Sequence, residues 1–196
     1  MEDITKLSDA SLLSLYKKET GMGFAPAESR SFDEVLRRYE KLIYHIARTY
    51  FQNLEDAKDA SQDAAIKIYN ALHRVVIEEN GNLKAWIATV TARTCLDIVR
   101  KKRPQTIELN TDISAGSVAS AEDSVIAKEK AEEILSAIKK LPDNHRMIII
   151  LRDMKGLSYE ELAGALSINI GTVKSQLSRA RAGLKKLLDG MGEPRR

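Results

Sequence analysis

Apolar residues recur at spacings of three and four along most of this chain, and that spacing is typical of amphipathic α-helices. A chain built this way is expected to be all-α. The pattern predicts helices at about residues 8–19, 32–50, 55–76, 83–103, 131–141, 147–151, 159–166 and 170–188.

Several helix ends carry local signals. Ser31 with Glu34, and Ser158 with Glu161, have the spacing of a capping box, in which each side chain bonds the other residue's backbone N–H. Pro104 ends the helix before it, because the residue preceding a proline is steered out of the helical region. Residues 21–26 interrupt the helical pattern and are interpreted as a linker, with a partner contact as the alternative.

Charge divides the chain into parts. The net charge is only +3, yet residues 32–103 carry +3 and residues 128–196 carry +5, whereas residues 104–127 carry −4 and residues 1–31 carry −1. Two basic blocks indicate a polyanion contacted twice. The predicted parts are an N-terminal helix with an irregular segment (1–31), a helical domain (32–103), an acidic flexible linker (104–130), a second helical domain (131–188) and a tail (189–196).

Composition narrows the class of protein. With 43% apolar and 30% charged residues, the chain is typical of soluble globular proteins. Its longest apolar run, residues 147–151, is too short for a membrane span, and the N-terminus lacks the order of a secretion signal. A cytoplasmic protein without membrane insertion is therefore expected.

No arrangement of residues indicates catalysis. Cys95 has no partner for an internal disulfide and is expected to be a small buried residue, and the three histidines, at 45, 73 and 145, are scattered. Asp56, Asp59 and Asp63 share one face of the helix at 55–76, but without a nearby histidine such a stripe favours a solvated or partner-binding face. The chain is not expected to be an enzyme or to bind a metal or cofactor.

The end of the chain has the order of a helix-turn-helix: a short helix at 159–166, a three-residue turn, and a long helix that Asn169 can cap. Its inward face is predicted as Ile170, Val173, Leu177, Ala180, Leu184 and Leu187. Residues 170–188 include five cations and no carboxylate, so the outward face favours a DNA major groove. The run of cations at residues 100–103 has two interpretations, phosphate contact and complementing the helix dipole.

Both blocks together resemble bacterial RNA polymerase sigma factors of the extracytoplasmic-function (ECF) class of the sigma-70 family. Residues 59–69 are similar to the family's D-x-x-Q-E-x-F-x-x-x-Y helix, and residues 84–103 to the tryptophan-containing helix that follows it. Leu141-Pro142, residues 157–163 and residues 171–181 resemble the start and end of sigma region 4. The likeness covers about 130 of the 196 residues, in the family's order.

The resemblance implies a sigma factor that binds core RNA polymerase and directs promoter-specific initiation, with no small-molecule substrate. It implies polymerase contacts with the β′ clamp helices and the β flap, a linker in the polymerase channel, and an anti-sigma partner. The implied contacts are Asp56, Asp59, Gln62 and Asp63 for the clamp; Val75, Arg93, Arg100, Lys101 and Arg103 for the −10 element; and Thr172, Lys174, Ser175, Ser178, Arg179 and Arg181 for the −35 element.

The chain departs from the family pattern at Arg93, where Asn is usual, at Glu78 and Glu79 in the −10 loop, and at Ala65, where Phe is common. The family's −10 base preference therefore does not transfer. One alternative is a freestanding helix-turn-helix repressor or activator. A third, an RNA-binding adaptor, is disfavoured because the aromatics that could stack on bases, Trp86 and Tyr69, are predicted to be buried.

Overall fold

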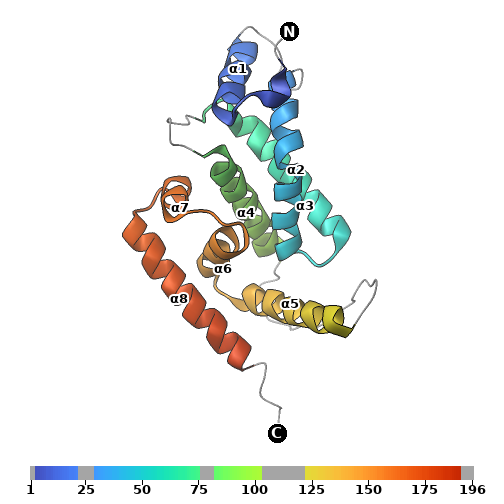
Figure 1. Ribbon diagram of the computed structural model, residues 1–196, viewed down its shortest axis with the longest axis vertical. Coiled ribbons are helices and arrows are strands. Elements are labelled where there is room, and N and C mark those ends of the chain that lie inside the picture. The colour runs from blue at the N-terminus through green and yellow to red at the C-terminus, as the bar shows by residue number, and fades with distance from the viewer. Residues whose placement is uncertain (1–2, 22–28, 76–81, 103–121, 191–196) are drawn as a thin grey trace.

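The computed structural model describes residues 3–21, 29–75, 82–102 and 122–190, and within them every regular element is helical, which confirms the all-α prediction (Figure 1). The expectations for residues 22–28, 76–81, 103–121 and 191–196 lie outside the described part. The elements are a 3-10 turn η1 (Ile4–Lys6), α1 (Asp9–Gly21), α2 (Arg30–Tyr50), α3 (Leu54–Leu72), α4 (Leu83–Lys102), α5 (Glu122–Lys140), α6 (Asp143–Ile149), a π-helical turn η3 (Ile150–Met154), α7 (Tyr159–Leu166) and α8 (Ile170–Asp189).

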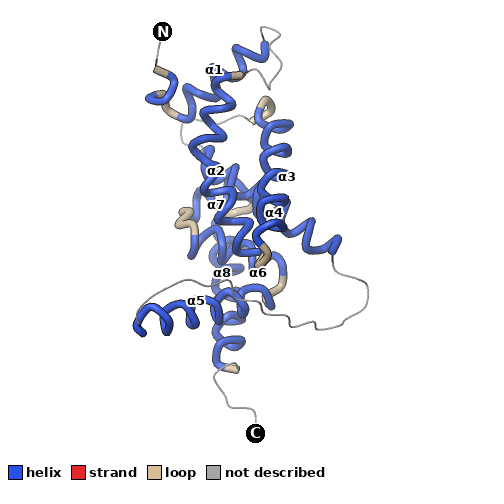
Figure 2. Tube along the Cα trace, turned by 90° about the vertical axis from the view of Figure 1, so that its right-hand side faces the viewer, coloured by secondary structure: helices blue, strands red, loops and turns tan. Residues whose placement is uncertain are grey.

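The molecule is elongated and consists of two helical units. Helices α2, α3 and α4 pack on one another with α1 against α2, and α5 to α8 form the second unit. Both views place the start of the chain beside α1 at one end and the end of α8 at the other (Figure 1, Figure 2). No helix in the described ranges is both long and apolar enough to cross a membrane.

The predicted capping box at the start of α2 is wrong. Ser29 is the N-cap, and its Oγ accepts a hydrogen bond from the Phe32 N–H at 3.1 Å. The Ser31 hydroxyl instead donates to Glu19 of α1 at 2.6 Å, and Glu34 is engaged by two arginines. Both serine hydroxyls donate to Glu19, but only the Ser29 oxygen also accepts from a backbone N–H of the first turn of α2.

Glu34 is a buried carboxylate held by charge-assisted bonds. It accepts from Arg37 Nε at 2.7 Å and from Arg38 Nε at 2.8 Å, and only 5% of its side chain is exposed. The hydrogen bonds from Arg37 and Arg38 lower the pKa of Glu34 to about 2. This contribution to stability is therefore present above the unfolded carboxyl pKa of about 4.3 and is lost as the pH falls through about 2.

We expect Glu34→Gln to remove part of this acid dependence. Urea unfolding at several pH values between about 5 and 2 should show the wild type losing more stability across the window than the variant. Equal slopes for the two proteins would contradict this role for the carboxylate.

The second unit begins earlier than predicted. Helix α5 starts at Glu122 rather than near Ala131, so the last nine residues assigned to the linker, 122–130, are helical. Their sequence contains good helix formers. Ile134 is 42% exposed, whereas Ile138 and Leu141 are buried, because only the last turns of α5 pack against the rest of the protein.

The helix-turn-helix follows the predicted boundaries. The capping box of α7 is present: the Ser158 N–H donates to Glu161 at 2.6 Å, and the Glu161 N–H donates to Ser158 Oγ at 3.0 Å. Gly156 precedes it at φ +73°, a conformation that favours glycine. The turn to α8 starts at Ser167, which adopts the left-handed conformation (φ 58°).

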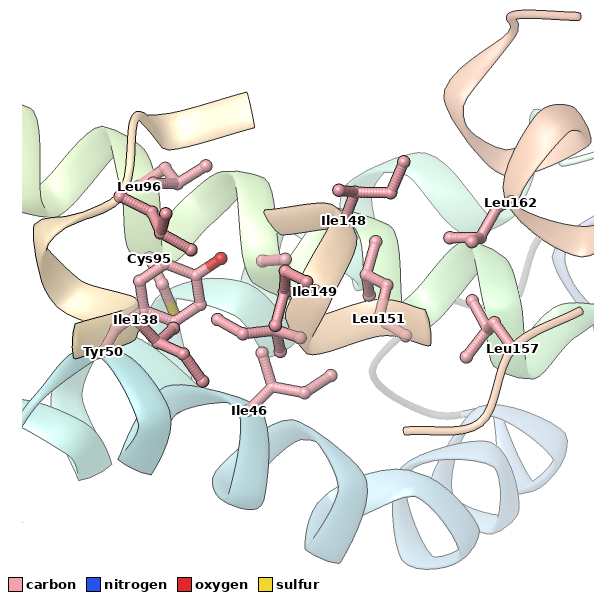
Figure 3. Packing of buried hydrophobic residues seen from close by; sticks show 14 of the residues in the cluster. Ile46, Tyr50, Cys95, Leu96, Ile138, Ile148, Ile149, Leu151, Leu157 and Leu162 are labelled. Carbon is pink, nitrogen blue, oxygen red and sulfur yellow. The ribbon is translucent and has the colours of Figure 1, made fainter. Parts of the chain in front are cut away.

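The two units share one hydrophobic core. Residues 148–151 are each no more than 2% exposed, and they lie between α2 and α4 of the first unit and the helices of the second. Figure 3 shows Ile46 of α2 beside Ile149, and Tyr50 of α2 and Leu96 of α4 near Ile138 in the same cluster. A helical segment that is apolar on all faces must be buried on all faces, and here α2 and α4 of the first unit bury part of its surface.

Polar contacts flank the shared core. Arg100 Nε of α4 lies 2.8 Å from Asp143 Oδ2 of α6, and Asn82 donates to Glu161 of α7. Cys95 is fully buried in this core, as predicted, and burial raises the pKa of its thiol to about 12, so the thiol stays protonated at neutral pH.

Candidate nucleic-acid interface

The outward face of α8 is built by the packing of its opposite side. Val173, Leu177 and Ala180 are buried against the second unit, so residues between them point outward. Ile170, predicted to be inward, is 38% exposed, because the buried stripe starts one turn later at Val173. The predicted −35 residues Lys174, Ser175, Ser178, Arg179 and Arg181 are exposed and Thr172 is partly buried.

The first turn of α8 is fixed by its cap. Asn169 Oδ1 accepts from the Thr172 N–H at 2.7 Å and from the Thr172 hydroxyl at 3.0 Å. A Cβ at Gly171 would lie 3.2 Å from that oxygen, so glycine leaves the cap its space. The Ser175 hydroxyl bonds the Thr172 carbonyl at 3.0 Å, so both hydroxyl hydrogens are used within the helix.

Cations lie on both flanks of this face. At 100° per residue, Lys174 and Arg179 stand on opposite sides of Ser175 and Ser178. Lys174 Nζ lies 5.9 Å from the centre of the Tyr159 ring of α7, which orients it by a cation–π contact. The Arg179 Nε donates to the Ser175 carbonyl at 3.3 Å. The face therefore offers two oriented cations about a strip of small polar residues.

Arg181 is engaged elsewhere. Its guanidinium forms a two-point contact with Asp153 of η3, Nε to Oδ2 at 3.0 Å and Nη2 to Oδ1 at 2.5 Å. This pair ties α8 to η3, so Arg181 makes a contact within the protein in addition to its predicted role in binding DNA.

Of the predicted −10 residues, Arg93, Arg100 and Lys101 lie on α4. Arg93 and Lys101 are exposed, and Arg100 stands seven residues after Arg93, hence on the same face about 10 Å further along. Arg100 is paired with Asp143, as described above. Val75 and Trp86 are partly buried, and both pack against the core of the first unit. Arg103 lies outside the described residues.

The acidic face of α3 is exposed and carries an apolar residue that the sequence reasoning missed. Asp59, Gln62 and Asp63 are exposed, Asp56 is partly buried, and Ile66 is 57% exposed. Ile66 follows Asp59 by seven residues and so lies on the same face, which is the signal that could have found it. The predicted docking face therefore carries one exposed apolar side chain among its carboxylates.

The part of the chain that the structure describes contains no cluster of three His, Cys, Asp or Glu suited to a metal ion. A shallow hollow on α2 is lined by Glu40, Lys41, Tyr44 and His45. These residues include no nucleophile paired with a base, and the hollow adds no site chemistry to the three faces above.

Comparison with known proteins agrees with this arrangement. The family model for sigma-70 region 2 matches residues 35–105, and that for sigma-70 region 4 matches residues 131–184. These segments hold the α3 and α4 faces and the α8 face, respectively.

Relatives of known class cover most of the chain. It is 31% identical over 161 residues to the RNA polymerase sigma factor YlaC of Bacillus subtilis, covering 80% of this chain and 91% of that one. It is 29% identical over 169 residues to the ECF RNA polymerase sigma factor SigW of the same organism, covering 81% and 89%. Among solved structures, the sigma factor RpoE from Bartonella quintana, in complex with the anti-sigma factor NepR, has a TM-score of 0.60 at 25% identity, covering 82% of this chain and 98% of that one.

Proposed function

Because the chain belongs to the ECF class of the sigma-70 family and acts in transcription initiation, we propose that it brings core RNA polymerase to promoters through three separate faces. The α8 face reads the −35 element in the major groove. The basic face of α4 holds the −10 element as it opens, and the α3 face docks on the β′ clamp helices, with the second unit on the β flap.

The outward face of α8 carries this proposal. Its first turns present Lys174 and Arg179 around small polar side chains, and residues 170–188 include no carboxylate that would repel phosphate. Lys and Arg read guanine edges, and residues near the start of a recognition helix are the ones that reach bases. The freestanding repressor alternative is not favoured, because a region 2 segment precedes this helix-turn-helix.

Gel filtration with purified core polymerase and transcription of a genomic fragment library test the proposal. We expect the chain to co-elute with core polymerase as a monomer and to give transcripts from a limited set of fragments. Failure to co-elute would overturn it, as would binding of the free chain to a DNA duplex as a dimer.

The α3 face gives a sharper test of docking. We expect Asp59→Lys to weaken the affinity for core polymerase, because charge reversal places a cation where the partner surface complements carboxylates. Affinity measured by fluorescence anisotropy should fall by roughly tenfold, which corresponds to about 1.4 kcal/mol.

Glu40→Lys is the matched control, since Glu40 is an exposed carboxylate on a different helix, α2. The same charge change there should leave polymerase affinity within about twofold of the wild type. Unchanged affinity for Asp59→Lys, or equal losses in both variants, would contradict docking through α3.

The remaining partners follow from this role. The structural relative RpoE is bound by the anti-sigma factor NepR, and we infer a comparable protein inhibitor for this chain. Work on polymerase and DNA requires a cytoplasmic location. Sigma factors are not enzymes as a family, so the chain contributes binding free energy while the polymerase performs the chemistry.

A further inference from the structure

Helix α1 lies outside the segments that the two family models match, yet it is tightly bound to the first unit. It packs against α2 at the end of the molecule where α3 ends (Figure 1, Figure 2). Leu12 and Tyr16 are fully buried and Leu13 is 4% exposed. A terminal helix with this burial is part of the core.

The cluster that α1 enters contains both helix ends next to the proposed −10 face. Leu72, the last residue of α3, and Leu83, the first of α4, belong to the same cluster as Leu12 and Tyr16. Val75 and Trp86 pack against this cluster. Side chains of α1 therefore belong to the same hydrophobic cluster as the last residue of α3 and the first residue of α4.

A chain of aromatic rings makes the connection direct. The Tyr16 ring centre lies 6.1 Å from that of Phe32, and Phe32 meets Tyr69 of α3 edge-on at 5.1 Å. Tyr69 stands one turn before the end of α3. Because these side chains are close-packed, displacing Tyr16 would require Phe32 and Tyr69 to repack as well.

Polar bonds fix α1 at both of its ends. Asp9 accepts from Arg38 Nη1 at 3.1 Å and from the Tyr39 hydroxyl, and Glu19 accepts from the hydroxyls of Ser29 and Ser31 at 2.6 Å each. Carboxylates receiving two bonds each hold α1 in one orientation on α2. These polar contacts at both ends restrict the orientation of α1 more than the burial of its apolar side chains alone would.

We propose that α1 is a positioning element for the −10 interface. By fixing the end of α3 and the start of α4 relative to each other, it keeps their residues in the geometry that captures an unstacked base. Contacts to the captured base must offset the free energy of unstacking it, so a small displacement of the residues that make these contacts weakens −10 binding. The inference rests on the proposed function of the α4 face and goes beyond it in assigning a role to α1.

The test compares variants of α1 in assembled holoenzyme. Tyr16→Leu removes the ring that meets Phe32, Tyr16→Phe keeps it, and the double change Asp9→Ala with Glu19→Ala releases both anchors without entering the core. Glu40→Gln on α2 is the control for the loss of an exposed carboxylate. Circular dichroism establishes the folded fraction of each variant.

Three affinities are measured for each variant: for core polymerase, for a −35 duplex, and for a single-stranded −10 oligonucleotide. The oligonucleotides are taken from a promoter that the wild-type holoenzyme transcribes. We expect Tyr16→Leu and the double variant to lose at least about fivefold in −10 affinity with less than about twofold change in the other two. Tyr16→Phe and Glu40→Gln should match the wild type.

Equal losses in all three affinities would show that α1 only stabilises the fold, and full retention of −10 affinity would show that it is not needed for positioning. Either result overturns the inference. If the wild-type holoenzyme itself fails to bind the −10 strand, the proposed function of the α4 face fails instead, so the two failures are distinguishable.

Discussion

Replacing Lys174 and Arg179 together by alanine is expected to abolish −35-dependent transcription while leaving holoenzyme assembly intact. The two cations flank the outward face of α8 and lie far from the acidic face of α3. Each base or phosphate contact of this kind contributes roughly 1–3 kcal/mol, so the pair should contribute roughly 2–6 kcal/mol. The lower value already corresponds to about a 30-fold loss in affinity.

The measurement pairs in vitro transcription with co-elution on core polymerase. Lys130→Ala with Lys140→Ala is the matched control, because it removes two exposed cations from α5 and none from α8. The control should keep most of the activity. Loss of co-elution in the α8 variant, or equal loss of transcription in both variants, would count against readout by α8.

Ile149→Ala is expected to destabilise both helical units at once. Ile149 is 2% exposed in the shared core, and truncating a buried isoleucine costs about 2–5 kcal/mol. That is a large fraction of the roughly 5–15 kcal/mol that stabilises a typical domain. The change lies in α6, yet its effect should reach α2 through Ile46 (Figure 3) and α4 through the hydrophobic cluster that both units share.

The single tryptophan makes this prediction measurable. Trp86 belongs to α4 in the first unit, so its fluorescence reports that unit, whereas circular dichroism reports all the helices. In urea, Ile149→Ala should shift both transitions to the same lower midpoint. Ile134→Ala, at an exposed position of α5, should change the free energy of unfolding obtained from either signal by no more than about 0.5 kcal/mol. A shifted circular dichroism transition with an unshifted Trp86 transition would show that the units unfold separately.

Local signals in the sequence predicted the helix-turn-helix closely. Ser158, Glu161 and Asn169 act within three residues of their partners, so their roles can be read from spacing alone. The error at Ser31 arose because its partner, Glu19, belongs to another helix twelve residues earlier. Tertiary competition of this kind leaves no mark in the local pattern.

The shared core was also missed, for a related reason. The apolar run at residues 147–151 indicates that this segment is buried on all sides, but periodicity does not say which helix covers each side. The acidic strip predicted two domains joined by a flexible linker, and the structure shows that the two all-α units also pack on each other around residues 148–151.

Two of the predicted DNA contacts are held by carboxylates in the protein. Arg100 pairs with Asp143 and Arg181 with Asp153, and both arginine side chains are more than half exposed. Because each guanidinium keeps this much exposed surface, a phosphate can approach it from the solvent side while the carboxylate stays in place. The positions predicted from sequence therefore remain compatible with DNA binding.

The isoleucines at the junction also make the arrangement of the two units sensitive to temperature. Any conformation in which the units part must expose Ile46 and Ile149 to water, and exposing apolar surface raises the heat capacity. The free energy of parting then curves with temperature and falls both on cooling and on heating away from its maximum. Temperature thus acts on the spacing of the two DNA-facing helices as well as on the stability of each.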